Sequence, residues 1–293
     1  MRFASAIFAA TATLAALIPN ARAYAQEPAP HAAESSSATY LGFDSNDYPG
    51  DAAIPLLAKT FKFSGYWLNA PPGEEPGEAV NGWKGKRKIL LKNGLGFLVL
   101  FNGRWERELE NENHAVSLGK SDAKAAVEAA ETEGFARGTV IFLDQEEGGS
   151  MSDDQMAYLL AWFDGVKSSG FYAGIYCSGM PADEGGGHFT ITANFIREHD
   201  EKRHVEFFVY NDACPPAPGC VYGQHAPAPS GSGVVFASIW QYAQSPQRMQ
   251  FTKKCRETYG LEGNCYPPAA GGAGQILLDL DSATSPDPSH GRQ

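Results

Sequence analysis

Short apolar segments alternate with amphipathic segments along the chain from Tyr40 onward. The apolar segments are rich in β-branched and aromatic residues and end at polar positions, which is typical of buried strands. This pattern predicts eight strands, at Tyr40–Asp44, Phe63–Asn69, Leu95–Asn102, Thr139–Glu146, Phe171–Cys177, Val205–Asp212, Val235–Tyr242 and Gln275–Asp281.

Three segments between these strands carry helix signals. The first is alanine-rich, with Ser121 as its expected N-cap and Gly134 as its end. The second begins at Ser152, where a capping-box pattern precedes apolar residues at helical spacing, and ends before Gly170. The range Thr190–His199 predicts the third helix.

Strands that alternate with helices favour a parallel sheet, because parallel neighbours need crossover connections. Eight such strands in one chain of this length predict an α/β fold, a single irregular (β/α)8 TIM barrel over residues 40–281. The irregularity is expected after Val205–Asp212, where a loop rich in proline, glycine and serine replaces a helix. Residues 282–293 contain prolines and no apolar face, which predicts a disordered tail.

The first 25 residues have the pattern of a secretory signal peptide. A basic start precedes an apolar, alanine-rich run and small residues at Ala23 and Ala25. A polar segment over 26–39 follows and is expected to be flexible. No other long apolar run exists, so we predict a soluble monomer that is secreted, periplasmic or held at the cell envelope, with no membrane span after cleavage.

Charge and motif content narrow the classes of function. Asp and Glu number 34 against 23 Lys and Arg, a net charge of −11. An acidic surface disfavours phosphate backbones, so we expect no nucleic-acid partner. The sequence contains neither a phosphate-binding glycine loop nor a Cys/His spacing typical of zinc, and we expect no metal and no cofactor.

The five cysteines suggest disulfides, as expected in an exported chain. Cys214 and Cys220 flank a proline-rich loop, and Cys255 and Cys265 lie ten residues apart, so two local pairs are predicted. Cys177 then remains as a free thiol, and its place at the end of an apolar strand predicts a small buried hydrophobe.

Two acids end the fourth predicted strand. Side chains alternate along a strand, so Asp144 and Glu146 share a face, with Cα atoms about 6.6 Å apart. A pair of carboxylates at this spacing is suited to acid and base catalysis. The alternative interpretation is a strand that ends in a solvated acidic turn.

The other predicted strands also end in polar or aromatic residues. In a parallel barrel these ends share the carboxyl face, where function is located. Acids and amides bind sugar hydroxyls, and aromatic rings stack on sugar rings, so the set predicts a carbohydrate site. The plainer alternatives are turn caps and, for Trp240, ordinary core packing. The set consists of Asp44, Asn69, Asn102, Asp144, Glu146, Tyr176, Asn211, Asp212, Trp240, Gln241, Tyr242, Asp279 and Asp281.

Several short motifs resemble glycoside hydrolase family 25, the barrel muramidases that cut peptidoglycan. They are Gly42-Phe43-Asp44-Ser45, Phe142-Leu143-Asp144-Gln145-Glu146, Gly174-Ile175-Tyr176-Cys177-Ser178, Ile239-Trp240-Gln241-Tyr242 and Leu278-Asp279-Leu280-Asp281. The chain more closely resembles a related family of exported glycoside-hydrolase-like proteins, in which the segment Leu118–Ala123 also fits. It departs from the muramidases in its Leu68–Lys88 insertion and its Cys214–Cys220 loop.

The resemblance implies roles for individual residues. Glu146 would be the general acid, and Asp144 its partner, which orients the acetamido group of the substrate. Sugar-binding positions would be Asp44, Tyr176, Trp240, Gln241 and Asp279, and the same rim adds Asp212 and Tyr242. Regular alternation cannot aim Trp240, Gln241 and Tyr242 into one site, so the resemblance suggests an irregularity in that strand.

Two functions from different classes follow. The first is an exported hydrolase of a peptidoglycan-type polysaccharide with N-acetylated β-1,4-linked sugars, in which a second carboxylate nearby favours the protonated form of the general acid. The second is a glycan-binding protein of the cell envelope that keeps the fold without catalysis, because acids and aromatics serve binding as well as cleavage.

Overall fold

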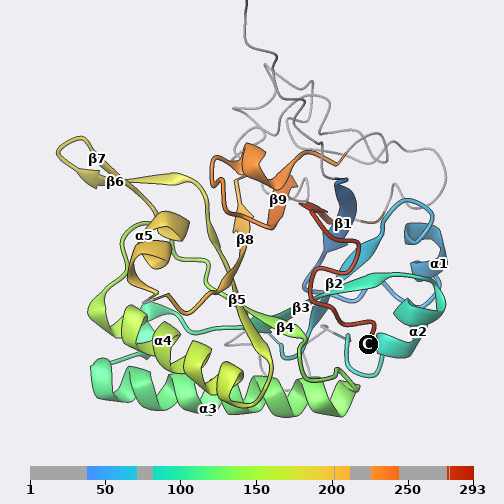
Figure 1. The fold of residues 1–293 in the computed structure, drawn as a ribbon, viewed down its shortest axis with the longest axis horizontal. Coiled ribbons are helices and arrows are strands. Elements are labelled where there is room, and N and C mark those ends of the chain that lie inside the picture. Colours follow the sequence, from blue (N-terminus) through green and yellow to red (C-terminus); the bar gives the residue numbers. More distant parts are fainter. Residues whose placement is uncertain (1–37, 71–81, 201, 212–225, 244–275, 277) are drawn as a thin grey trace, which may run out of the picture. The chain divides into compact units, whose positions relative to one another are not determined.

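A computed structural model describes residues 38–70, 82–200, 202–211, 226–243, 276 and 278–293. Its central feature is a closed eight-stranded barrel in the order β1-β10-β9-β8-β5-β4-β3-β2 (Figure 1). All eight predicted strands are present, which confirms the α/β barrel. They are β1 (Tyr40–Asp44), β2 (Phe63–Trp67), β3 (Gly96–Asn102), β4 (Val140–Asp144), β5 (Tyr172–Ser178), β8 (Glu206–Tyr210), β9 (Ile239–Ala243) and β10 (Asp279–Ala283).

One strand runs against the expected direction. The prediction of a parallel barrel is wrong for β10, which is antiparallel to both β1 and β9, whereas the other neighbouring strands pair in parallel. In the β1–β10 register Asp44 pairs with Asp279 and Tyr40 with Ala283. Asp279 therefore begins its strand but lies at the carboxyl end of the parallel strands.

The helices surround the barrel and are α1 (Ile54–Leu57), α2 (Arg87–Lys92), α3 (Glu112–Glu133), α4 (Asp153–Ser168) and α5 (Thr192–His199), with short 3-10 turns η1 (Glu106–Glu108) and η2 (Pro229–Ser232). Helices α3 and α4 lie side by side (Figure 1). Glycine allows this approach, because a Cβ at Gly119 would lie 2.4 Å from the carbonyl oxygen of Tyr158.

The predicted helix boundaries are partly correct. Gly134 ends α3 with a positive φ of 84°, and Ser152 caps α4 in a capping box with Gln155, as predicted. Ser121 was expected to begin α3 but lies in its interior. The helix begins after Asn111, whose side chain accepts a hydrogen bond from the amide of His114. The added turns belong to the packed part of the helix, since Ala115 and Gly119 are buried, and the choice of Ser121 as N-cap placed the start of the helix too late.

A two-stranded hairpin was not predicted. It consists of β6 (Pro181–Gly185) and β7 (His188–Ile191) and extends from the barrel (Figure 1). Its turn uses Gly185, Gly186 and Gly187, all with positive φ, a conformation that glycine adopts without steric cost. The hairpin shortens the third predicted helix, so that α5 begins at Thr192 instead of Thr190.

The prediction of a disordered tail over 282–293 is wrong. Ser282 and Ala283 belong to β10, and the following residues bind the starts of β3 and β4. The amide of Val99 donates to Ser289 Oγ at 2.8 Å, and that of Val140 donates to the Ser289 carbonyl at 2.9 Å. The tail carries few apolar residues, but its polar groups satisfy barrel amides, which a criterion based on hydrophobic periodicity does not detect.

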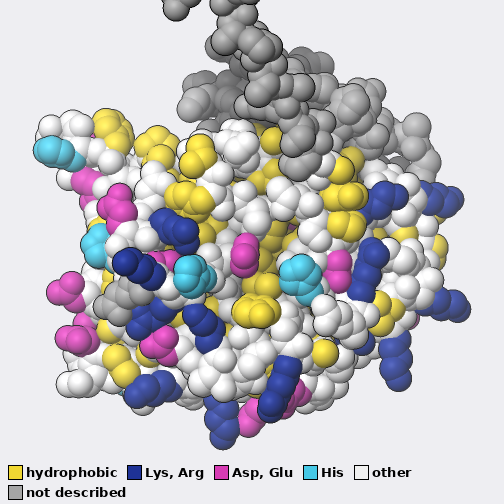
Figure 2. Space-filling view, viewed as in Figure 1, with side chains coloured by type: hydrophobic (Ala, Val, Ile, Leu, Met, Phe, Trp, Pro, Cys, Tyr) yellow, Lys and Arg dark blue, Asp and Glu magenta, His cyan; other side chains and the backbone are white. Residues whose placement is uncertain are grey.

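Several predictions concern residues outside the described ranges: the signal peptide, most of the flexible segment 26–39, and the cysteines Cys214, Cys220, Cys255 and Cys265. Cys177 is free and buried, as predicted. No helix within the described ranges is long and apolar enough to cross a bilayer. Figure 2 shows acidic and basic side chains interspersed on one face, with no continuous basic stripe across it.

Candidate active site

A pocket of about 40 Å³ opens at the carboxyl end of the parallel strands. Each of the eight barrel strands contributes one side chain to it, and two further side chains come from the segments that follow β1 and β4. The strand residues are Asp44, Trp67, Leu100, Asp144, Tyr176, Phe208, Gln241 and Asp279, and the additional ones are Asn46 and Glu146.

A larger cleft of about 160 Å³ adjoins this pocket. Both hollows are lined by Asn46, Asp144 and Glu146. The predicted carboxylate pair therefore lies where the pocket and the cleft meet. The cleft is also lined by Asn102, Gly103, Arg104, Trp105 and Gln145.

The segment that carries Glu146 is fixed through its backbone. The hydroxyl of Tyr210 donates to the Glu146 carbonyl at 2.9 Å. Three residues further on, Thr192 Oγ1 accepts from the amide of Gly149 at 2.8 Å and donates to its carbonyl at 3.0 Å. These contacts hold the backbone at and after Glu146, whose side chain is exposed. A fixed backbone reduces the reorganisation that a reaction requires.

The neighbouring acid, Glu147, is occupied by structural contacts. Its Oε2 accepts from the amide of Glu106 at 2.9 Å and from the Gln155 amide group at 2.8 Å. It also accepts from Gln145 Nε2 at 3.3 Å. Glu147 thus anchors the segment after β4 to α4 and to the loop after β3. Glu146, the acid before it, instead lines both the pocket and the cleft.

Gln241 connects the acids of the pocket floor. Its Nε2 donates to Asp44 at 2.9 Å and to Asp279 at 3.5 Å, and its Oε1 accepts from the Tyr176 hydroxyl at 2.9 Å. Burial raises the pKa of Tyr176 well above its usual value, and the nearby Asp44 and Asp144 carboxylates raise it further. Tyr176 therefore remains a neutral hydrogen-bond donor.

Asp281 lies one layer below, fully buried in the barrel. It pairs with Gly42 on β1 and with Gln241 on β9. No N–H or O–H donor of the described residues hydrogen-bonds to its oxygens, so an ionised Asp281 would be left buried and unsatisfied. Burial raises the pKa of Asp281 well above its usual value, and the carboxylates of Asp44 and Asp279 add to the shift.

Trp240 and Tyr242 lie on the opposite face of β9 from Gln241. The two rings contact each other at a centroid distance of 5.9 Å, and Trp240 Nε1 donates to the carbonyl of Asn211. Both side chains are buried, and neither lines the pocket or the cleft. The register shifts here, with Leu280 opposite Ala243 and Asp281 opposite Gln241, which leaves Tyr242 as an extra residue on β9. The predicted irregularity is present, but it does not bring all three side chains together.

Other predicted residues have mixed outcomes. Asp44, Tyr176 and Asp279 converge with Asp144 and Glu146 on the pocket, whereas Asp212 lies outside the described residues. Sequence reasoning missed Trp67 and Trp105. Trp67 ends β2, so the rule that selected the other strand ends could have identified it. Trp105 lies beyond β3 and carries no comparable signal. Among the described residues no group of three or more acids, histidines or cysteines could hold a metal ion.

Comparisons with known proteins agree with the motifs. Residues 80–207 match the family model described as Rv2525c-like, glycoside hydrolase-like domain. This confirms the predicted resemblance over a range that includes Asp144, Glu146 and Tyr176. No curated protein matches the sequence significantly.

Solved structures share the fold at low sequence identity. An uncharacterized B. stearothermophilus protein is 17% identical with a TM-score of 0.50, covering 83% of this chain and 95% of that chain. The Mycobacterium tuberculosis Tat-secreted protein Rv2525c is 13% identical with a TM-score of 0.50, covering 87% and 98%. A glycosyl hydrolase 25 of Streptococcus pneumoniae is 13% identical with a TM-score of 0.47, covering 83% and 86%.

Proposed function

We propose that this chain, which carries a segment of the Rv2525c-like glycoside hydrolase-like family, is an exported hydrolase of peptidoglycan-type glycans with N-acetylated β-1,4-linked sugars. The observation that carries the proposal is the position of Asp144 and Glu146 at the junction of two hollows. A polymer that spans both hollows would present its glycosidic bond to this pair. Export rests on the signal-peptide pattern of residues 1–25.

Glu146 acts as the general acid in this proposal. It donates a proton to the glycosidic oxygen as the bond to the anomeric carbon breaks, so that the leaving sugar departs with a hydroxyl group. The acetamido oxygen of the retained sugar attacks the anomeric carbon, and Asp144 orients and stabilises the acetamido group. Water then opens this intermediate and returns a proton to Glu146, which restores the starting state.

The hydrogen-bonded floor of the pocket would hold the retained sugar. Gln241 fixes the Asp44 and Asp279 carboxylates, which are acceptors for sugar hydroxyls, and Tyr176 is kept in place by the same amide. Because these groups are oriented before substrate arrives, little reorganisation accompanies binding. The concentration of acids also disfavours polyanionic chains such as polyuronates, so neutral N-acetylated sugars fit the site better.

The test compares Glu146→Gln with the parent on purified peptidoglycan and on chitooligosaccharides. We expect release of reducing ends by the parent and its loss in Glu146→Gln, with an unchanged melting temperature. Glu198→Gln, an exposed acid-to-amide change on α5, is the matched control and should keep full activity. Equal activity of Glu146→Gln and the parent would refute the assignment. If the parent binds the glycan in a pull-down but releases nothing, the glycan-binding alternative is correct.

A further inference from the structure

We propose that the cleft beside the carboxylate pair, lined by Asn46, Asn102, Arg104 and Trp105, is a second sugar subsite in which Trp105 stacks on the pyranose ring. The inference rests on the proposed function, because it takes the Asp144–Glu146 pair as the point of cleavage. The pocket would hold one sugar and the cleft the sugar across the cleaved bond.

Trp105 has the exposure of a binding residue. It is half-buried and lines the cleft, whereas Trp240 and Trp162 are buried in the protein. The guanidinium group of Arg107 lies over the Trp105 ring, 5.1 Å from its centroid, which helps to hold the indole in one orientation. A large ring that is partly ordered before binding loses little conformational entropy when a sugar packs on it.

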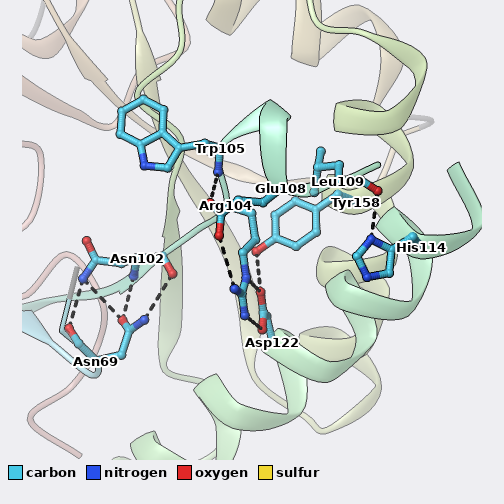
Figure 3. Close-up of polar contacts among 9 residues, drawn as sticks. All are labelled: Asn69, Asn102, Arg104, Trp105, Glu108, Leu109, His114, Asp122 and Tyr158. Carbon is cyan, nitrogen blue, oxygen red and sulfur yellow. Dashed lines mark hydrogen bonds and ion pairs between the residues drawn. The ribbon is translucent and has the colours of Figure 1, made fainter. Parts of the chain in front are cut away.

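A partly buried ion pair holds the start of this loop. Arg104 donates to both carboxylate oxygens of Asp122 on α3, from Nε at 2.8 Å and from Nη2 at 3.0 Å (Figure 3). The hydroxyl of Tyr158 on α4 donates to the same carboxylate at 3.0 Å. Burial raises the pKa of Tyr158 well above its usual value, and the hydrogen bond to Asp122 raises the pKa of Arg104. Arg104 and Tyr158 therefore keep their protons over the pH range of an assay, and the loop remains anchored to α3 and α4.

A second set of contacts links Trp105 to the segment of the general acid. Its backbone amide donates to Glu108 Oε2 at 2.8 Å, and the next amide, that of Glu106, donates to Glu147 Oε2 at 2.9 Å. Glu147 directly follows Glu146 in the chain. Through these short connections the backbone at Trp105 is joined to the segment that carries Glu146, which helps to set the spacing between the two residues, as a polymer with a regular repeat requires.

The polar groups of the cleft are oriented for uncharged sugar substituents. Asn69 engages both the Nδ2 and the backbone amide of Asn102, so the Asn102 side-chain oxygen points away from Asn69 and can accept from a hydroxyl (Figure 3). Trp83 Nε1 donates to the carbonyls of Ser45 and Asn46, which fixes the loop carrying Asn46.

Charge selects the class of sugar. The positive charge of Arg104 is matched by Asp122, with Glu108 also within 3.4 Å of its guanidinium, so Arg104 offers N–H groups without a net positive charge. The cleft is also lined by Asp144 and Glu146. A sugar with a free carboxylate would be repelled there, whereas an N-acetylhexosamine offers an amide and hydroxyls that match these groups.

The experiment measures binding of the N-acetylglucosamine trimer to the parent and to Trp105→Ala, Trp105→Leu and Trp105→Phe by calorimetric titration. Loss of the ring in the Ala and Leu variants should weaken the affinity about tenfold, and the Phe variant, which keeps a ring, should lose less. Tyr172→Ala is the matched control, because Tyr172 is an exposed aromatic residue at the amino end of β5, and should bind as the parent does. Thermal melting identifies any variant that does not fold.

The outcomes separate this inference from the proposed function. Parent-like binding by folded Trp105→Leu or Trp105→Ala would overturn the subsite, even if Glu146→Gln abolishes cleavage. Equal losses in the Phe and Leu variants would also count against stacking. A parent that neither binds the trimer nor cleaves peptidoglycan would overturn the proposed function and the subsite with it.

Discussion

Replacing Asp281 by Asn should change how the stability of the protein depends on pH. Asp281 is fully buried without a hydrogen-bond donor of the described residues, and burial beside the Asp44 and Asp279 carboxylates raises its pKa well above the usual value. In the unfolded chain the same carboxyl group ionises near its ordinary pKa of 3.8. Because the folded pKa is raised, folding retains a proton that the unfolded chain loses, and stability due to this group decreases as pH rises above about 4.

The magnitude follows from linkage between protonation and folding. With one more proton bound in the folded state, the free energy of unfolding falls by about 1.4 kcal/mol for each pH unit, until pH reaches the folded-state pKa of Asp281. Asn has nearly the same shape, can donate from its amide to Asp44, and does not ionise. The difference in stability between Asp281→Asn and the parent should therefore grow with pH from pH 5 upward, by about 1.4 kcal/mol per pH unit below the folded-state pKa of Asp281, in favour of the variant.

Urea unfolding at pH 5, 6 and 7 measures this difference directly. The other carboxylates that face Asp281, those of Asp44 and Asp279, are present in both proteins, so most of their contribution cancels in the comparison. Equal m-values are needed for the free energies to be compared. A difference that stays constant across the three pH values would show that Asp281 is ionised in the folded protein, and the reasoning would fail.

Two further predictions concern the stability of the fold. Ser289→Ala leaves the buried amide of Val99 without its acceptor and should lower the free energy of unfolding, measured in urea, by about 1 to 3 kcal/mol. A loss below about 0.5 kcal/mol would contradict a structural role for the tail. Trp240→Ala should create a cavity beside Tyr242 and destabilise the fold by about 3 to 5 kcal/mol with glycan affinity unchanged, whereas lost affinity at full stability would support the sugar contact instead.

Much of the barrel could be predicted because its signals are local. Most barrel strands are apolar segments with polar residues beside them, although β10 is not, and Ser152 and Gly134 are standard helix ends. The start of α3, the hairpin and the ordered tail were missed, since Asn111, Gly185 and Ser289 act through hydrogen bonds or backbone conformation and leave no hydrophobic period. Such features depend on partners that are distant in sequence.

The candidate site was predictable only as far as strand ends define it. The strand-end rule found Asp44, Asp144, Tyr176 and Asp279, but it had no means of finding Trp105, which lies on the loop after β3. It also selected both Trp240 and Gln241 as site residues. Because side chains alternate along β9, Gln241 lines the pocket, whereas Trp240 lies on the other face of the strand and donates to Asn211. Which face of β9 is internal depends on the register with β8 and β10, and that register is a property of the closed barrel.

The direction of a single strand determines the chemistry of two acids. If β10 were parallel to its neighbours, Asp281 would lie nearer the carboxyl face and Asp279 deeper in the barrel. The β1–β10 register shows the opposite arrangement, with Asp279 beside Asp44 and Asp281 beside Gly42. Because β10 is antiparallel, Asp279 lines the pocket and accepts from Gln241, whereas Asp281 is buried beneath Asp44. Burial favours the neutral form of the Asp281 carboxyl group. Two aspartates separated by one residue thus lie in different environments, and of the two only Asp279 lines the pocket.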